Sequence, residues 1–347
     1  MNPYLLENFY DEMFETSQNV RPAYFPFRAR TKEIPAEEMA QKQFSVERSL
    51  LSLGVTFNVY GKKESIERIW PMDIIPRIIS LKEWKILEKG LIQRITTLNL
   101  FLDDIYHDQK IIRDKILPLG LIESCKCYLP QCRGINPPKG IWCHITGTDI
   151  VRDKDGTFYV LEDNLRCPSG VAYVLQNREL LKQTFPEMFE KQKILPVNEY
   201  PFKLLGMLNY LSSEKNPTVV LLTPGIYNSA YYEHTFLAQQ MGIELVEGRD
   251  MVVQDGEVKM RTTRGFQKVD VIYRRIDDTF LDPLVFDRNS LLGVPGMLDV
   301  YKKGKITLVN APGTGVADDK FIYSYVEKMI RYYLNEEPII PNVPTYV

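Results

Sequence analysis

The stretch Val160-Leu-Glu-Asp-Asn-Leu-Arg-Cys-Pro-Ser-Gly170 runs from an apolar segment directly into charged and amide side chains. Working back from it, residues 146–164 read TGTDIVRDKDGTFYVLEDN, which are two strand-like runs joined by Lys154-Asp155-Gly156-Thr157. An Asp-Gly pair between alternating runs is a strong signal for a tight turn. The stretch therefore predicts a two-stranded β-hairpin with unusually polar side chains at the end of its second strand.

One face of this hairpin is predicted to carry three oxygen-bearing side chains. Glu162 and Asn164 are two residues apart and share a face, whereas Asp163 points the other way. Two different turns could join the strands, and in both of them Asp149, on the first strand, lies on the same face as Glu162. Two carboxylates and an amide oxygen should therefore converge.

The two possible turns differ in register. If Asp155-Gly156 are the central residues of a type I′ turn, Asp149 lies directly opposite Glu162. If Lys154-Asp155 are central, Asp149 lies opposite Val160 and still on the same face. Both registers stay open at this point.

Two close carboxylates repel each other unless a cation lies between them. Mg²⁺ binds oxygen ligands from one or two carboxylates and completes its shell with water and substrate phosphate. Asp149, Glu162 and Asn164 therefore suggest a metal and phosphate site. The alternative is a solvated hairpin in which Asp163 or Arg166 pairs with Glu162.

Length and composition place the chain among folded globular proteins. Its 347 residues suggest two or three packed units, and 44% hydrophobic and 25% charged residues are average values. The net charge of -2 provides no field that would hold nucleic acid or an anionic membrane. We expect a small-molecule or peptide partner, with neither nucleic acid nor membrane as a partner.

The acidic N-terminus MNPYLLENFYDEMFE has no basic or apolar signal region, and no long apolar run follows, so a cytoplasmic location is expected. An odd number of cysteines suggests reduced thiols, because disulfide frameworks use pairs. Their spacing lacks the paired C-x2-C knuckles of zinc sites. The five are Cys125, Cys127, Cys132, Cys143 and Cys167.

Two further regions have clear patterns. Ser80 and Glu83 form an S-x-x-E capping box, and apolar residues recur every three or four positions from Trp84 to Ile105, which predicts a long amphipathic helix. The first 45 residues have no clear period, and residues 118–140 have a loop composition. A helix is expected from Val171 to Phe189.

Residues 215–310 alternate between strand and helix. Strands are expected at 219–222, 243–248, 269–275 and 305–310, with helices at about 230–241, where Gly242 follows the last turn, and 288–303. This alternation is typical of a parallel sheet. The fold class is therefore α/β, with an open α/β domain.

The spacing D-x12-E-x-N of Asp149, Glu162 and Asn164 resembles the magnesium motif of ATP-grasp ligases. Longer phrases resemble the circularly permuted ATP-grasp type 2 family, relatives of glutathionylspermidine synthase, from about residue 10 to the end of the chain. These phrases include ERIWPMDIIPRII, GLIQRITTLNLFLDDIY, VLEDNLRCPSGVAYVLQNR, VDVIYRRIDDTFLDP and GTGVADDK.

The resemblance implies an ATP-grasp-like fold and a carboxylate-amine ligase, in which ATP phosphorylates a carboxylate and an amine displaces phosphate. ATP and Mg²⁺ would be the cofactors, and a small-molecule or peptide carboxylate and an amine the substrates. The expected metal ligands are Asp149, Glu162 and Asn164, and Asn164 would also contact the nucleotide. Arg166 would stabilise the acyl phosphate, or would form a structural ion pair.

Other expected roles follow from the resemblance. Ser169 and Gly170 would form a turn that holds a substrate carboxylate. Asn228 and Ser229 open a helix whose N-terminus attracts an anionic substrate group.

Arg274 and Arg275 follow a strand, and only one of them can face the cleft, because adjacent strand residues point to opposite sides. Arg274 is favoured as catalytic and Arg275 as substrate-binding, and the alternative is pairing with Asp277 or Asp278.

The resemblance also suggests domain boundaries. Residues 1–200 would contain a helical region and the metal-binding lobe, 201–310 the substrate-side α/β domain, and 311–347 the start of a truncated nucleotide lobe. Lys320 would begin a helix and contact the nucleotide, with a strand at IIPNVPTY.

The sequence departs from the family after Val347, where members continue with a lysine strand and a glycine-rich phosphate loop. We expect this chain alone to have little ATPase activity, and a separate chain could supply the missing lobe. A non-catalytic binding or scaffold protein is the alternative. A sugar-nucleotide transferase would explain the α/β alternation and leave the hairpin face unexplained.

Overall fold

The computed structural model describes residues 9–16, 19–60 and 65–346. Residues 1–8, which begin the acidic N-terminal segment, lie outside the described residues. The chain divides into two compact units. The first consists of residues 1–88, 152–158 and 170–199, and the second of residues 89–151, 159–169 and 200–347. The expected boundaries at 200 and 310 stay predictions.

The first unit is mainly helical. Its elements are α1 (Phe25–Thr31), α2 (Ala36–Ser52), β1 (Thr56–Tyr60), β2 (Ser65–Ile69), α6 (Val171–Thr184) and α7 (Pro186–Lys191). Aromatic rings pack inside it: Phe27 meets Phe185 edge to face at 5.7 Å, and Trp70 stacks on Tyr173 at 4.2 Å. The first 45 residues, for which no period was evident, thus contribute α1 and part of α2.

The helix predicted from Val171 to Phe189 is interrupted. It ends at Thr184, and a second helix begins at Pro186, whose ring nitrogen has no hydrogen to continue the helical ladder. Proline is well suited to the first turn of the new helix, because the amide hydrogens there have no helical partner.

The long helix α3 (Leu81–Tyr106) has the predicted capping box. The Ser80 amide donates to Glu83 Oε2 at 2.9 Å, and the Glu83 amide donates to Ser80 Oγ at 3.3 Å. The apolar stripe is buried toward its end, at Leu98, Leu102 and Ile105. At its beginning Trp84 keeps 39% of its surface exposed.

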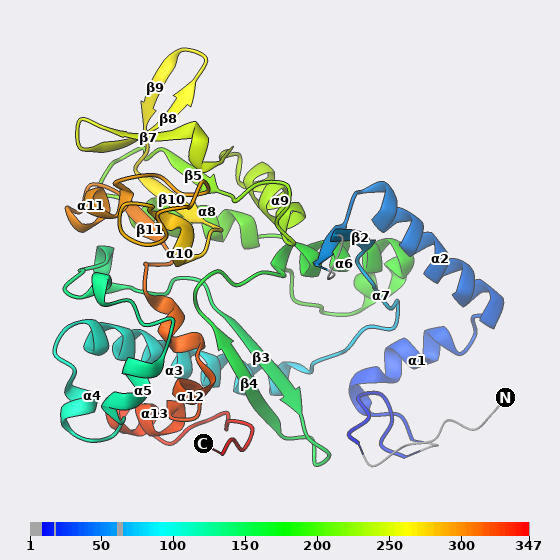
Figure 1. The fold of residues 1–347 in the computed structure, drawn as a ribbon. Helices are drawn as coiled ribbons and strands as arrows, with labels where there is room; N and C mark the ends of the chain where they lie inside the picture. Colours follow the sequence, from blue (N-terminus) through cyan, green and yellow to red (C-terminus); the bar gives the residue numbers. More distant parts are fainter. Residues whose placement is uncertain (1–8, 17–18, 61–64, 347) are drawn as a thin grey trace. The chain divides into compact units, whose positions relative to one another are not determined.

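The second unit contains the predicted parallel sheet. Its strands are β5 (Val219–Leu222), β6 (Glu244–Val246), β10 (Val271–Arg274) and β11 (Thr307–Val309), in the order β11-β10-β5-β6. Every neighbouring pair in it is parallel, as the alternation predicted. Figure 1 labels β5, β10 and β11 of this sheet and the helices α8 (Tyr200–Tyr210) and α9 (Tyr231–Met241) that pack near them.

Helix α9 (Tyr231–Met241) connects β5 to β6 and ends where Gly242 adopts φ +67, as predicted. Helix α8 (Tyr200–Tyr210), which we did not predict, packs against α9 and β10. The helix expected at 288–303 is only α11 (Met297–Lys302), and α10 (Asp278–Leu281) precedes it.

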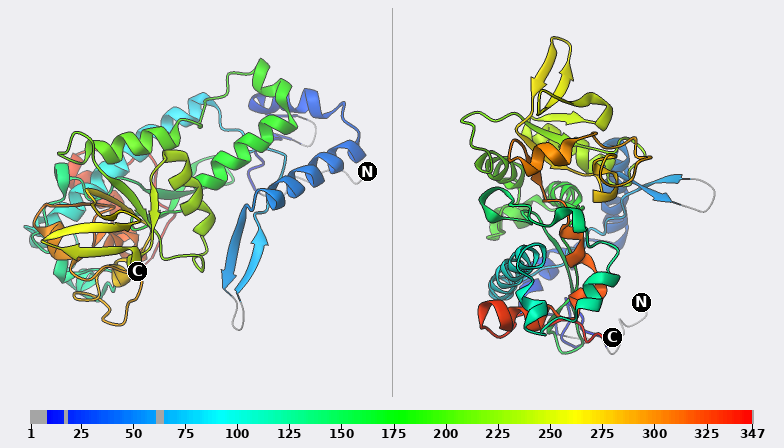
Figure 2. Two further views of the ribbon diagram at one scale, coloured as in Figure 1. Left: turned by 90° about the horizontal axis from the view of Figure 1, so that it is seen from above. Right: turned by 60° about the vertical axis from the view of Figure 1, so that its left-hand side comes forward.

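A second sheet in this unit was not predicted. It contains β7 (Met251–Gln254), β8 (Glu257–Thr262) and β9 (Gly265–Lys268), which pair antiparallel in that order. Figure 2 shows this ribbon projecting beyond the parallel sheet. Its first turn places Asp255 at φ 57 and Gly256 at φ 71, so the type I′ turn occurs here.

The hairpin β3 (Gly147–Arg152) and β4 (Phe158–Asn164) forms its own two-stranded sheet. Beside β4, the amide of Val160 donates to the carbonyl of Pro341, and its carbonyl accepts from Val343. Short helices complete this region: α4 (Lys110–Arg113), α5 (Leu119–Ser124), α12 (Lys320–Tyr323) and α13 (Val326–Leu334).

Within the second unit, one hydrophobic core contains residues of α3, of the parallel sheet and of the segment that directly follows β4. Its members include Phe101, Trp142, Leu165, Ile272 and Leu308. This shared core fixes the end of β4 against the carboxyl end of β10. Within the described residues, no helix combines the length and apolar character needed to cross a bilayer.

Candidate active site on the hairpin

The turn of the hairpin has the central residues of the second turn considered above, with one extra residue in the loop. The Asp153 amide donates to the Thr157 carbonyl at 2.9 Å, and the Gly156 amide donates to the Asp153 carbonyl at 2.8 Å. Lys154 and Asp155 are therefore the central residues, and Gly156, at φ +86, is an extra bulged residue. The type I′ turn predicted at Asp155-Gly156 is wrong, because a three-residue loop forms instead.

The two faces of β4 separate as predicted. Asp163 is buried, and Arg94 Nε and Nη2 donate to its carboxylate at 2.8 and 2.6 Å. Asn164, on the other face, donates through Nδ2 to Glu162 Oε1 at 3.4 Å. The alternative that Asp163 or Arg166 pairs with Glu162 is wrong, since both have other partners.

Asp149 lies beside Glu162. Partial burial raises the pKa of Asp149, and the adjacent Glu162 carboxylate, with which it shares a hydrogen bond, raises it further. The pKa of Glu162 is lowered, mainly because Lys320 and then Asn164 hydrogen-bond to it. The three predicted oxygen donors therefore come together on one face.

Lys320 supplies the positive charge at this face. Its Nζ lies 2.5 Å from Glu162 Oε2 and 3.1 Å from the Leu161 carbonyl oxygen. Helix α12 begins at Lys320, as expected, because the Asp319 side chain accepts the amide of Phe321 at 2.8 Å.

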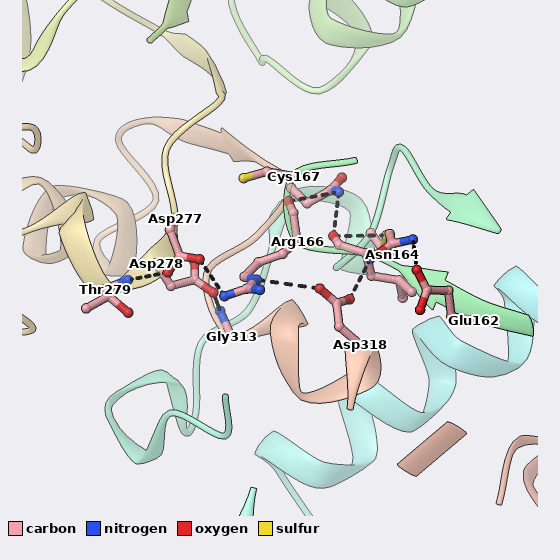
Figure 3. A network of polar contacts seen from close by, with 12 residues as sticks. Glu162, Asn164, Arg166, Cys167, Asp277, Asp278, Thr279, Gly313 and Asp318 are labelled. Carbon is pink, nitrogen blue, oxygen red and sulfur yellow. Dashed lines mark hydrogen bonds and ion pairs between the residues drawn. The ribbon is translucent and has the colours of Figure 1, made fainter. Parts of the chain in front are cut away.

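Arg166 is held between two carboxylates. Its Nη1 donates to Asp277, and its Nε lies 3.5 Å from Asp318 Oδ2 (Figure 3). Burial raises the pKa of Asp318 to about 6, although the Leu165 amide donates to it at 2.6 Å. Asp277 also caps α10 by accepting the Thr279 amide at 3.0 Å.

We did not predict Asp318 as part of this cluster. The signal available in the sequence was its place in the ADDK motif, two residues before Lys320. The Asp277 and Asp318 contacts match the ion-pair alternative for Arg166, and they also fix its guanidinium beside the end of β4.

Arg274 and Arg275 are both buried, on opposite sides of their strand. Arg274 lies 2.8 Å from Asp278 and donates to the carbonyl of Asn310 at 2.7 Å. These contacts favour the structural alternative for Arg274, with Asp278 as the partner.

Arg275 holds the loop that follows the hairpin. It donates to Glu233 Oε1 at 2.9 Å, to Ser169 Oγ at 2.5 Å and to the Pro168 carbonyl at 2.5 Å. Ser169 is thus fixed by Arg275, whereas Gly170, at φ +124, lies in the first unit and precedes α6.

Asn228 and Ser229 lie just before α9, at the carboxyl end of β5. Asn228 Oδ1 accepts the amide of Ala230 at 2.9 Å, which stabilises the turn into the helix. The strand order changes direction between β5 and β10, and ligands of open α/β sheets bind outside the carboxyl ends of strands at such a point. The substrate-binding roles of these residues stay predictions.

The donor set suits a hard divalent cation. Asp149 and Glu162 offer two carboxylates and Asn164 an amide oxygen, which is the small protein contribution that Mg²⁺ uses beside phosphate and water. Among the described residues, no cluster of three or more histidine, cysteine, aspartate or glutamate side chains offers a richer metal site. Burial and then the Glu162 carboxylate raise the pKa of Asp149, so a cation bound between the two carboxylates would favour their charged forms.

Comparison with known proteins decides the family. Residues 76–347 match the family model described as circularly permuted ATP-grasp type 2. The chain belongs to this family. An uncharacterised protein of Synechocystis sp. is 57% identical over 98% of this chain and 71% of its own length.

Other relatives are longer still. An uncharacterised protein of Mycobacterium tuberculosis is 47% identical over 97% of this chain and 61% of its own length. A Frankia alni protein named "Putative glutamate--cysteine ligase 2-3" is 36% identical over 99% of this chain and 41% of its own length. The chain thus spans about two fifths to seven tenths of these relatives.

A solved structure has the same fold. The apo form of a glutathione synthetase-like effector (GSS30) from Globodera pallida superposes with a TM-score of 0.55, at 11% identity. The match covers 88% of this chain and 69% of that one. At this identity the likeness supports the ATP-grasp-like fold alone.

Proposed function

We propose that the chain carries the metal and substrate part of an ATP- and Mg²⁺-dependent carboxylate-amine ligase that acts through an acyl phosphate. Two Frankia relatives named as glutamate–cysteine ligases support this class of reaction. The observation that carries the proposal is the convergence of Asp149, Glu162 and Asn164 on one hairpin face, with the Lys320 ammonium beside them.

Asp149, Glu162 and Asn164 would hold the metal. When bound, Mg²⁺ would neutralise charge on the phosphoryl group that ATP transfers. Lys320 would contact phosphate oxygens from the same face, because its ammonium already lies against Glu162.

Arg166 would stabilise the acyl phosphate. Its guanidinium is fixed by Asp277 and Asp318 at the end of β4, so little rotational freedom is lost when an anion binds. Arg275 would position Ser169, and Asn228 and Ser229 would contact the carboxylate substrate. Arg274 would support β10 through Asp278.

The second candidate is a binding or scaffold protein without catalysis. The contact of Lys320 with Glu162 and the two carboxylates around Arg166 favour it, because these charges are already balanced within the chain. A balanced site can keep the fold without turning over ATP.

Binding measurements on the full chain test the proposal. Mn²⁺ alone, followed by electron paramagnetic resonance, and Mg²⁺-ATP, followed by calorimetry, should both bind. Glu162→Gln should weaken Mn²⁺ binding by about tenfold or more, because an anionic ligand becomes neutral. Asp153→Asn is the matched control, an exposed acid at the tip of the same hairpin, and should leave binding unchanged.

The enzyme and scaffold hypotheses then separate in a turnover assay. A ligase releases ADP only when both a carboxylate and an amine are supplied, so ATP consumption is screened against pairs of amino acids and short peptides. Because this chain alone is expected to turn over little ATP, the assay also includes the remaining part of a longer relative, such as the Synechocystis protein. If Mg²⁺-ATP binds and no pair stimulates turnover even then, the scaffold hypothesis is correct. If Glu162→Gln binds Mn²⁺ as tightly as the unaltered chain, the metal site itself is refuted.

A further inference from the structure

Two thiols lie side by side, next to Arg166 and its carboxylate partners Asp277 and Asp318. Cys125 and Cys127 follow α5 directly, in a turn closed by the Tyr128 amide, which donates to the Cys125 carbonyl at 3.0 Å. The two cysteines are the first and third residues of this turn, separated only by Lys126. Cys125 is 6% exposed, and Cys127 is partly exposed.

The surroundings of Cys127 favour its thiolate. The hydrogen bond from Cys125 and, less strongly, the Arg166 charge lower the pKa of Cys127 to about 7, although partial burial opposes them. Arg166 and Cys127 both lie against Gly315. A Cβ atom added to Gly315 would lie 2.9 Å from Arg166 Cδ and 3.4 Å from Cys127 Cβ. A cation near a partly exposed sulfur is the usual setting of a reactive cysteine.

The other three cysteines have surroundings that disfavour the reactive thiolate form. Cys132 and Cys143 are buried in the core, and burial raises the pKa of both thiols. Burial also raises the pKa of Cys167, whose thiol donates to the Ile276 carbonyl at 3.3 Å. These thiols therefore serve as internal references for an unreactive cysteine.

We propose that Cys125 and Cys127 form a reversible dithiol–disulfide site that takes a low-molecular-weight disulfide as its oxidant. The Cys127 thiolate attacks one sulfur of the small disulfide, the S–S bond breaks, and one small thiolate leaves and takes up a proton. Cys125 then loses its proton to solvent and attacks the Cys127 sulfur, which releases the second small thiol. Two cysteines are oxidised, and one small disulfide is reduced to two thiols.

The expected rate follows from the thiolate fraction. With a pKa of about 7, half of Cys127 is thiolate at neutral pH, against about 3% for an ordinary cysteine. The lower basicity reduces the intrinsic nucleophilicity about fivefold, so the net gain is about threefold. Cys127 should thus react about three times faster than an ordinary exposed thiol and far faster than Cys132.

The sequence provides a sharp readout, because Lys126 separates the two cysteines. The full chain is treated with bis(2-hydroxyethyl) disulfide, alkylated and digested with trypsin. Disulfide formation should join the peptides 116–126 and 127–133 until they are reduced, and fragmentation spectra should place the link on Cys127 and not on Cys132, which the second peptide also contains. Cys125→Ser should instead retain one mercaptoethanol adduct on Cys127, and Cys127→Ser should leave Cys125 unreacted.

Circular dichroism of each variant checks that it folds. The proposal is overturned if the unaltered chain keeps a stable adduct on Cys127, if Cys125 reacts equally in Cys127→Ser, or if Cys127 reacts no faster than Cys132. None of these results depends on ATP or on ligase activity, so the thiol site and the proposed function are tested separately.

Discussion

Glu162 and Asp163 are neighbours in the chain and should respond to amide substitution in opposite ways. Asp163 points into the second unit and pairs with Arg94, and both side chains are at most 1% exposed. Glu162 points to the metal face, where its side chain is 34% exposed and that of Lys320 is 55% exposed. Asp163→Asn should therefore reduce stability, and Glu162→Gln should reduce metal binding.

The magnitudes follow from burial. Asp163→Asn leaves the Arg94 guanidinium buried opposite a neutral amide, and breaking such a pair costs about 3–5 kcal/mol. For a unit of about 220 residues, this lowers the melting temperature by on the order of 10 °C. Glu162→Gln breaks an exposed pair, which is worth about 1 kcal/mol or less.

Thermal and urea unfolding of both variants provide the assay. Arg94→Met combined with Asp163→Leu is the informative control, because it removes both charges and should recover most of the loss. Mn²⁺ binding is measured well below the transition, where the Asp163→Asn variant is still folded and should bind normally.

Equal stability losses in the two single variants would refute this account of the hairpin faces. So would an unchanged melting temperature for Asp163→Asn. A double variant as unstable as Asp163→Asn would show that the loss arises from packing, and not from the unpaired charge.

Three further predictions concern stability. The pKa of Asp318 is about 6 in the folded protein, against about 3.9 in an unfolded chain. Between these two values the folded protein binds one more proton than the unfolded chain. The stabilisation from Asp318 therefore decreases as pH rises from 4 to 6. Urea unfolding should show a loss of up to about 3 kcal/mol over that range, relative to Asp318→Asn, and a flat difference would contradict it. Gly248→Ala should cost about 1–3 kcal/mol, because its Cβ would lie 2.4 Å from the Leu292 carbonyl oxygen. Gly206→Ala, in α8 with open space around it, should instead stabilise by about 0.4–1 kcal/mol in the same melting assay.

The parallel sheet was predictable because its signals are local. The run Val219–Leu222 is apolar throughout, and Gly242 marks the end of the following helix. The sheet β7-β8-β9 carried an equally clear signal in Asp255-Gly256, which we did not use. Helix α8 was missed because it directly follows an irregular polar segment.

The type of turn could not be settled from the Asp-Gly pair alone. Asp255-Gly256 takes up two positive φ angles, whereas Asp155 stays at negative φ and only Gly156 is positive. At the second site, Asp155 Oδ1 accepts the Thr157 amide at 2.9 Å and Asp153 Oδ1 accepts the Lys154 amide at 2.7 Å. These side-chain bonds stabilise the three-residue loop, and they depend on the residues around the pair.

Strand alternation made the metal face predictable, whereas the partners of its charges depend on distant parts of the chain. Arg94 is 69 residues from Asp163, and Lys320 is 158 residues from Glu162, so no local pattern could assign either contact. The two contacts are nevertheless coupled through the backbone of β4. Arg94 holds Asp163 on the buried side, and strand alternation places Glu162 and Asn164 on the opposite side, so the ion pair and the metal face occupy the two sides of one strand without touching.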